Sequence, residues 1–159
     1  MLTQERLKEL LHYDPDTGIF TRMTSTGGVK IGSVAGANHS RGYLQCSIDG
    51  KLYLCHRLAW LYITGEFPLD QIDHISGNKK DNRILNLRDV NNTTNQQNIK
   101  TCKSNNKLVV LGVHSSRGKF KAEIRINGKK KQLGHFQTPE LANAAYLEAK
   151  RKHHEGCTI

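Results

Sequence analysis

Apolar and polar residues alternate with a period of two in residues 119–127, the pattern of a strand with one buried face. The apolar positions are Phe120, Ala122, Ile124 and Ile126, and the polar positions are Lys119, Lys121, Glu123 and Arg125. Asn127-Gly128 follows as a two-residue hairpin signal, so we expect residues 129–136 to form the next strand.

The flanking segments complete this C-terminal pattern. An apolar run predicts a strand over residues 108–113, and a turn over residues 115–118 joins it to the alternating strand. Thr138 and Pro139 begin a helix. Its apolar stripe is thin and made mostly of small residues: Leu141, Ala144, Ala145 and Ala149. A helix of this kind can lie close on a three-stranded antiparallel sheet whose other face carries the charges.

The N-terminal half alternates short helices with hairpins. Leucines at helical spacing behind a Thr3 cap begin the series, and Asp49-Gly50 marks its hairpin. In order, the pattern predicts a helix over residues 3–12, a turn over 14–18, an irregular stretch over 24–42, strands over 43–48 and 51–55, and a helix over 56–63.

Residues 71–99 are unusually rich in asparagine. The pattern predicts a short strand over 71–75, a polar loop over 76–82, a strand over 84–90, and a helix from Asn91 or Asn92 to about residue 99. Asparagine is poor in helices and strands, so either a solvent loop or a site with neutral oxygen ligands explains the run. The predicted order is strand, loop, strand, helix.

Composition favours small cores and a polyanionic partner. Only 36% of residues are hydrophobic and there is one Trp. The formal charge is +10: residues 1–99 hold 11 basic and 10 acidic side chains, and residues 100–159 hold 13 and 4. This asymmetry favours a nucleic-acid-binding module on a nearly neutral body, and the alternative is a merely solubilising surface.

The cysteines and the chain start exclude several classes. Cys46, Cys55, Cys102 and Cys157 contain no C-x-x-C pair, so no structural zinc is expected. Residues 1–6 do not resemble a signal peptide, and no apolar run has the length of a membrane span. We therefore expect free thiols and a cytoplasmic protein with no membrane partner.

Asp73-His74 is the candidate chemical centre. On a strand the two side chains diverge, so Asp73 can bind a cation while His74 faces a substrate. The return helix could bring Asn95 beside Asp73, and the two oxygen donors suit Mg²⁺ (or Mn²⁺) with several waters. His74 could take a proton from water. The alternatives are a surface histidine and a merely polar helix face, on which Asn91, Asn92, Gln96 and Asn98 compete with Asn95.

Other polar residues have supporting or binding roles in this hypothesis. Asn86, between two leucines, is expected to bond loop backbone and fix the loop that follows His74. His56 is a candidate packed or supporting residue behind the site. The candidate DNA contacts are Lys79, Lys80, Arg83 and Arg88 near the loop, and Arg117, Lys119, Lys121, Arg125, Lys129 and Lys130 in the tail; a solvated surface is the alternative. Glu123 could accept from a cytosine amino group.

The central motif resembles the HNH nucleases of phages and introns. The matching residues are Asp73-His74, Asp81-Asn82-Arg83, Asn86-Leu87-Arg88 and Asn95, with Tyr13–Gly18 and His56–Trp60 upstream. The resemblance implies a ββα-metal (His-Me finger) fold, His74 as general base, Asp73 and Asn95 as ligands of one ion, and Asn86 as the loop-fixing catalytic residue. The last position of the motif is Asn95 and not His, which is similar to the homing-endonuclease branch of the family.

The tail resembles the DNA-binding domain first known from plant APETALA-two and ethylene-response factors. The matching residues are Gly112-Val113, Gly118–Ala122, Ile124, Gly134–Phe136 and Ala142–Ala145. The expected class is α+β: a ββα-metal core plus a three-stranded antiparallel sheet on one helix. The expected segments are an N-terminal region over 1–45 that completes the core or contacts DNA, a nuclease domain over 46–100, a linker over 101–107 and the tail domain over 108–156.

The resulting hypothesis is that the chain is a metal-dependent DNA endonuclease that nicks double-stranded DNA. The resemblance suggests a phage or mobile-element protein of a bacterial host. No obligate protein partner is evident, so we expect a monomer. The first alternative is a catalytically inactive, sequence-specific DNA-binding protein. A non-specific nuclease toxin is a third possibility, and an RNA target has little support because no aromatic stacking platform stands out.

Overall fold

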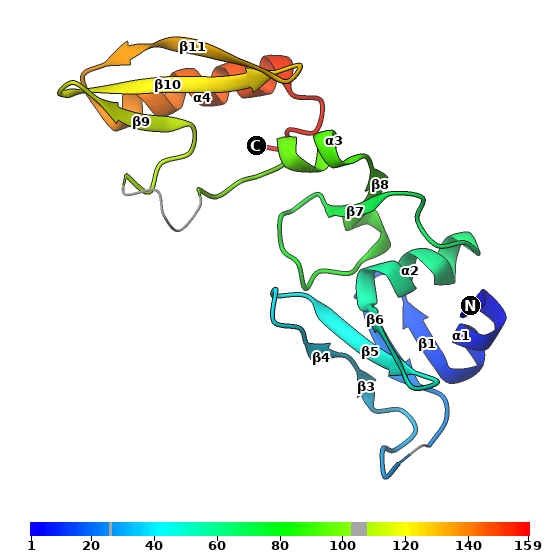
Figure 1. The fold of residues 1–159 in the computed structure, drawn as a ribbon. Coiled ribbons are helices and arrows are strands. Elements are labelled where there is room, and N and C mark those ends of the chain that lie inside the picture. The colour runs from blue at the N-terminus through cyan, green and yellow to red at the C-terminus, as the bar shows by residue number, and fades with distance from the viewer. Residues whose placement is uncertain (26, 103–107) are drawn as a thin grey trace. The chain divides into compact units, whose positions relative to one another are not determined.

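The computed structural model describes residues 1–25, 27–102 and 108–159. It divides into two compact units, Met1–Asn92 and Thr93–Ile159, and each is described by itself (Figure 1). Both are mixed α/β, with small antiparallel sheets. Most of the expected linker, residues 103–107, lies outside the described residues. In the described part of the chain, no helix has the length and hydropathy needed to cross a membrane.

The first unit holds two three-stranded sheets, β1-β2-β3 and β4-β5-β6, and the hairpin β7-β8. Its elements are α1 Gln4–Leu10, β1 Leu11–Asp14, β2 Ile19–Arg22, β3 Val34–Ala35, β4 Ala37–Asn38, β5 Leu44–Ile48, β6 Lys51–Leu54, α2 Cys55–Thr64, β7 Gln71–His74, the 3-10 helix η1 Ile84–Asn86 and β8 Leu87–Val90.

One apolar cluster joins the N-terminal residues to α2. Leu7, Tyr13 and Phe20 are buried in the same cluster as Leu58 and Leu61 of α2. The Tyr13 and Phe20 rings lie 4.7 Å apart between centroids. Side chains of the N-terminal residues therefore pack in the same core as α2 and as Ile72 of β7. All four cysteines are free thiols, as expected from the sequence.

Three segments of the first unit differ from their predicted structure. The stretch over 24–42, expected to be irregular, contains the short strands β3 and β4. The helix expected over 3–12 ends at Leu10, and residues 11–14 pair with residues 19–22 as a hairpin. Leu11 and Tyr13 point into the core while His12 is exposed, so burial selects a strand. Residues 84–90 were expected to be one strand, but η1 precedes β8. The 3-10 turn leaves Leu85 exposed and lets the Asn86 amide reach the loop backbone.

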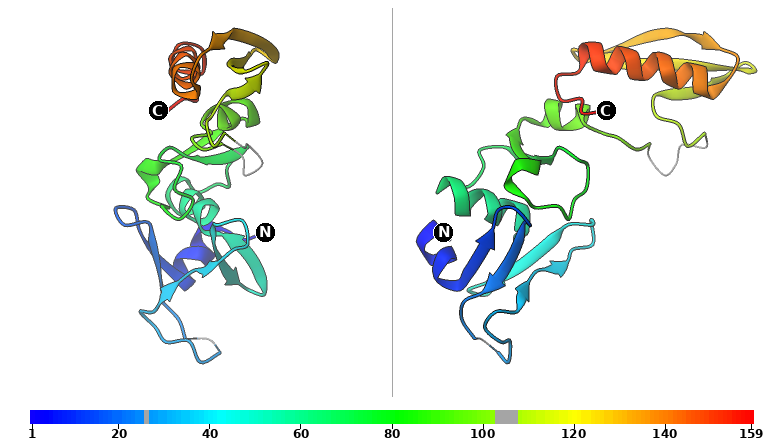
Figure 2. Two further views of the ribbon diagram at one scale, coloured as in Figure 1. Left: turned by 90° about the vertical axis from the view of Figure 1, so that its left-hand side faces the viewer. Right: turned by 180° about the vertical axis from the view of Figure 1, so that it is seen from behind.

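The second unit is a three-stranded sheet covered on one face by a helix. It contains β9 Val113–Ser116, β10 Lys119–Ile126, β11 Lys129–Phe136 and α4 Pro139–His153, together with most of α3 Asn92–Gln97. β10 is the central strand, and α4 packs along it, as the view from behind shows (Figure 2). Ala122, Ile124 and Ala142 are buried between the sheet and the helix.

Two details of the second unit also differ from prediction. The strand expected over 108–113 begins only at Val113, because Gly112 lies with positive φ where any larger residue would meet the Tyr146 ring. The predicted helix stripe is partly wrong: Leu141 and Ala144 are exposed. The buried face of α4 instead centres on Ala142 and the half-buried Tyr146, whose large ring fills the space expected for small side chains.

Candidate nuclease site

Asp73 and His74 lie next to each other at the end of β7, and both are buried. Asp73 is opposite Arg88 in the β7–β8 hairpin, and the Arg88 Nε and Nη2 atoms donate bonds of 2.9 Å and 2.7 Å to Asp73 Oδ2. The pair satisfies a carboxylate that would otherwise be costly to bury. Both bonds end on the same oxygen, Oδ2.

His74 lies among two aromatic rings and the following loop. Its ring centroid is 5.1 Å from that of His56 and 5.8 Å from that of Tyr43. Burial lowers the pKa of His74, although the neighbouring Asn82 amide and the charge of Asp73 oppose this effect. The imidazole is therefore neutral near pH 7, the state in which a ring nitrogen can accept a proton.

His56 is a second buried imidazole on the first turn of α2. Burial first, and then the proximity of His74, lowers the pKa of His56 to about 3. Its Nδ1 atom has no hydrogen-bond partner among the described residues. Two protonated rings 5.1 Å apart would repel each other, so a His56 that is neutral near pH 7 is compatible with a proton arriving on His74.

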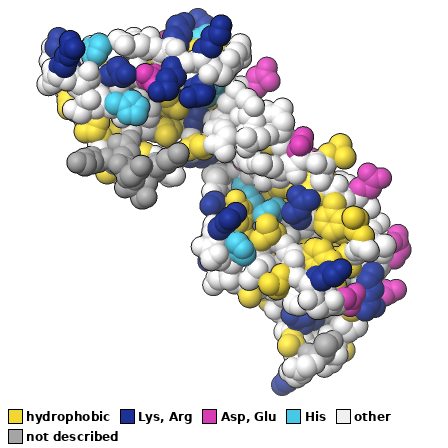
Figure 3. All heavy atoms as spheres, viewed as in Figure 1, with side chains coloured by type: hydrophobic (Ala, Val, Ile, Leu, Met, Phe, Trp, Pro, Cys, Tyr) yellow, Lys and Arg dark blue, Asp and Glu magenta, His cyan; other side chains and the backbone are white. Residues whose placement is uncertain are grey.

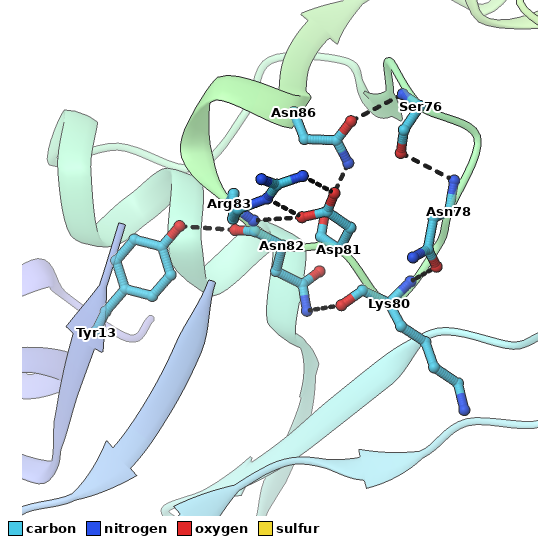
Figure 4. A network of polar contacts seen from close by, with 8 residues as sticks. All are labelled: Tyr13, Ser76, Asn78, Lys80, Asp81, Asn82, Arg83 and Asn86. Atoms are coloured by element: carbon cyan, nitrogen blue, oxygen red, sulfur yellow. Dashed lines mark hydrogen bonds and ion pairs between the residues drawn. The ribbon is translucent and has the colours of Figure 1, made fainter. Parts of the chain in front are cut away.

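The loop after β7 is held in shape by asparagine side chains (Figure 4). Asn86 Oδ1 accepts from the Ser76 backbone N–H at 2.8 Å, and Asn86 Nδ2 donates to the Asp81 carbonyl at 2.8 Å. Asn78 Oδ1 accepts from the Lys80 N–H, and Asn82 Nδ2 donates to the Lys80 carbonyl. The asparagine-rich run is therefore a loop whose backbone is fixed largely by its own side chains.

The predicted basic contacts of this loop have different environments. The Arg83 guanidinium pairs with Asp81 at 2.6 Å, and Arg88 pairs with Asp73. The Lys79 ammonium donates to the Arg41 carbonyl at 3.1 Å and lies 4.9 Å from the centre of the Tyr43 ring. Lys80 is exposed. Their contacts with DNA stay predictions, and for Arg83 and Arg88 a phosphate would compete with an existing carboxylate.

Asn95 lies on α3, in the segment that belongs to the second unit. Its pairing with Asp73 therefore stays a prediction. Among the described residues, no group of three or more His, Cys, Asp or Glu side chains could hold a metal ion. One carboxylate and one amide are nevertheless oxygen donors of the kind that Mg²⁺ takes, with water in the remaining positions.

The sheet face of the second unit that points away from α4 is basic (Figure 3). Lys119, Lys121 and Arg125 share this face of β10 with Glu123. Glu123 is bound by Lys121 at 3.0 Å and by Lys130 at 3.3 Å, which lowers the pKa of its carboxyl group. The carboxylate predicted to accept from cytosine is therefore already engaged. Arg117 lies in the β9–β10 turn, and Lys129 begins β11.

Three residues near His74 received no role from the sequence. Tyr43 contacts both buried histidines, Asn82 influences the pKa of His74, and Arg41 lies in the turn that Lys79 reaches. Asn82 belongs to the recognised Asp81-Asn82-Arg83 motif, so its position was a usable signal. Tyr43 and Arg41 lie in a stretch with no motif, and only the packing of β5 beside α2 brings them to the site.

Comparison with known proteins supports a nuclease assignment for this region. Residues 53–97 match the family described as HNH endonuclease. No curated protein and no solved structure gives a significant match. The matched segment runs from β6 to α3 and includes Asp73, His74, Asn86 and Asn95. The match is confined to residues 53–97 and supports an HNH nuclease domain in that segment.

Proposed function

We propose that the chain is a metal-dependent DNA endonuclease that hydrolyses one phosphodiester bond per site. The proposal rests on the environment of His74. It is a buried, neutral imidazole at the end of β7, beside an ion-paired carboxylate and within the HNH endonuclease match. A general base that is unprotonated near neutral pH is what hydrolysis by water requires.

In the proposed step, a ring nitrogen of His74 takes a proton from water as the water oxygen attacks phosphorus. The bond from phosphorus to the leaving nucleoside oxygen breaks, and that oxygen takes a proton from solvent water. Asp73 and Asn95 would hold one Mg²⁺ or Mn²⁺ ion, which neutralises charge on the phosphate when bound. Asn86 keeps the loop after His74 in a single shape through its bonds to Ser76 and Asp81.

The basic sheet of the second unit is proposed to hold the DNA. Its support is the charge of residues 100–159, which is 13 basic against 4 acidic side chains. Proposed phosphate contacts are Arg117, Lys119, Lys121, Arg125, Lys129 and Lys130. One His74 per chain suits cutting of one strand, so we propose nicking by a monomer.

A second candidate function is DNA binding without cleavage. The Arg88–Asp73 ion pair favours it, because the proposed cation must share the carboxylate that Arg88 already holds. Incubation of supercoiled plasmid with Mg²⁺ or with EDTA tests the choice. Open circles with Mg²⁺ alone support the nuclease. Intact plasmid with Mg²⁺ or Mn²⁺, together with a salt-sensitive gel shift, supports the binding protein.

A further inference from the structure

The segment His39–Tyr43 forms a closed turn between β4 and β5. The His39 N–H donates to the Tyr43 carbonyl at 2.8 Å, and the Gly42 N–H donates to the His39 carbonyl at 2.9 Å. The Arg41 N–H donates to the His39 ring Nδ1 atom at 3.1 Å. Gly42 takes φ +85°, which a side chain would strain. The turn is therefore a defined structure, although the sequence suggested only an irregular stretch.

Lys79 ties this turn to the loop that follows His74. Its ammonium bonds to the Arg41 carbonyl at 3.1 Å and lies 4.9 Å from the centre of the Tyr43 ring. Tyr43, two residues further along, lies 5.8 Å from the His74 ring. The turn and the loop thus meet beside the candidate base. In the first unit, histidine side chains appear next to Lys and Arg side chains on the surface (Figure 3).

The two cations at this junction are not equivalent. The Lys79 ammonium group is bonded to the Arg41 carbonyl and lies over the Tyr43 ring, so it holds the turn in place. Arg41 is exposed, and no described residue gives its guanidinium a hydrogen bond or an ion pair. A guanidinium can bind a phosphate through two parallel hydrogen bonds, which a lysine cannot do. Arg41 is therefore the side chain at this junction with both charge and donors available.

We propose that the His39–Tyr43 turn is a substrate-binding element of the nuclease unit, in which Arg41 binds a DNA phosphate close to the one attacked and Lys79 is a positioning residue. This rests on the proposed function, since it concerns the DNA cleaved at His74. The alternative is that the turn only closes the β4–β5 hairpin, in which case Arg41 is a solvated side chain.

The test is the salt dependence of plasmid nicking by the full chain with Arg41→Gln. At fixed Mg²⁺, kcat/KM is measured over a series of KCl concentrations. Loss of one phosphate contact should reduce the slope of log kcat/KM against log salt by about 1. At low salt kcat/KM should fall about tenfold, the value of one charge-assisted hydrogen bond.

Arg6→Gln is the matched control, because it makes the same substitution at another position of the first unit. Arg6 lies on α1 and forms ion pairs with Glu9 and Asp49. Its loss should therefore leave the slope unchanged. Lys79→Met should lower kcat/KM in the wild-type background and have little further effect in Arg41→Gln. A lysine that only stabilises the fold would lower kcat/KM equally in both backgrounds, and this would overturn the positioning role.

The outcomes separate this inference from the proposed function. Efficient nicking by the wild type with an unchanged slope in Arg41→Gln overturns the substrate-binding turn and leaves the nuclease intact. No metal-dependent nicking by the wild type overturns the proposed function, and the inference with it. If Arg41→Gln alters the far-ultraviolet circular dichroism, Arg41→Lys provides the second variant: it keeps the charge, so it should keep the slope and lose part of kcat/KM.

Discussion

The Tyr13 hydroxyl on β1 donates a 2.7 Å hydrogen bond to the backbone carbonyl of Asn82, in the loop that faces His74. Tyr13 is buried against Phe20 and Tyr62, and this burial raises the pKa of its hydroxyl group. The hydroxyl group therefore stays protonated and donates a bond from the N-terminal hairpin to the candidate site. It gives Tyr13 a structural role in the first unit.

Tyr13→Phe removes the hydroxyl group and keeps the aromatic ring, so it should weaken the attachment of this loop without changing the packing of the ring. The change leaves the Asn82 carbonyl buried without its donor, which should lower the free energy of unfolding by about 1–2 kcal/mol. Urea denaturation followed by circular dichroism measures this loss. Tyr53→Phe is the matched control, because the Tyr53 ring stacks on Phe67 and should tolerate loss of its hydroxyl. Equal losses in both variants would argue against a specific tie to the loop.

Asn86→Ala should destabilise the first unit by about 2 kcal/mol or more, because it leaves the Ser76 N–H and the Asp81 carbonyl unpaired at a part-buried position. Asn78→Ala, which removes an exposed bond to the Lys80 N–H, should cost much less. Denaturation midpoints of the two variants give the comparison. Similar midpoints would show that the loop does not depend on Asn86.

Acidification should destabilise the protein through His56. Its pKa is about 3 in the folded protein and near 6.5 in the unfolded chain, so between these values the unfolded state binds the extra proton. Stability contributed by neutral His56 is present above pH 6.5 and falls by up to about 1.4 kcal/mol per pH unit below it. His56→Gln should flatten the dependence of the unfolding free energy on pH between 4 and 6.5. A slope identical to that of the wild type would contradict the buried neutral state.

Gly156→Ala should disrupt the packing of the C-terminal residues on α3. A Cβ atom at this position would run into the Thr94 carbonyl and the Gln97 side chain, and the Gly156 N–H already donates to Gln97 Oε1 at 3.0 Å. Hydrogen exchange of α3 should accelerate strongly in this variant. Gly118→Ala is the control in the same unit: its Cβ meets open space, so its cost is the left-handed backbone alone, about 1 kcal/mol. Slow exchange in Gly156→Ala would show that the tail does not hold the helix.

Features with local chemistry could be predicted from the sequence. Asp49-Gly50 and Asn127-Gly128 form the expected hairpin turns, with positive φ at both residues of each pair. Thr3 and Thr138 cap their helices. The alternation in β10 fixed its buried face, with Ala122 and Ile124 inside. In each case the signal lies within a few neighbouring residues.

Features decided by distant contacts could not be predicted. Leu10 and Leu11 fit a helix by spacing, and only the core around α2 selects a strand from Leu11 onward. At the site, Asp73 and His74 were visible as a motif, whereas their contacts with Arg88, Tyr43 and Asn82 depend on how sheets and loops pack. The environment of a motif residue is a tertiary property, even when the residue itself is evident.

The most direct test of His74 as the general base compares the wild type with His74→Ala and His12→Ala on supercoiled plasmid with Mg²⁺, with DNA affinity measured in parallel. His12 is exposed on β1 and serves as the control histidine. We expect open circles from the wild type and His12→Ala, none from His74→Ala, and equal affinity for DNA in all three. Nicking by His74→Ala at the wild-type rate would contradict His74 as the general base.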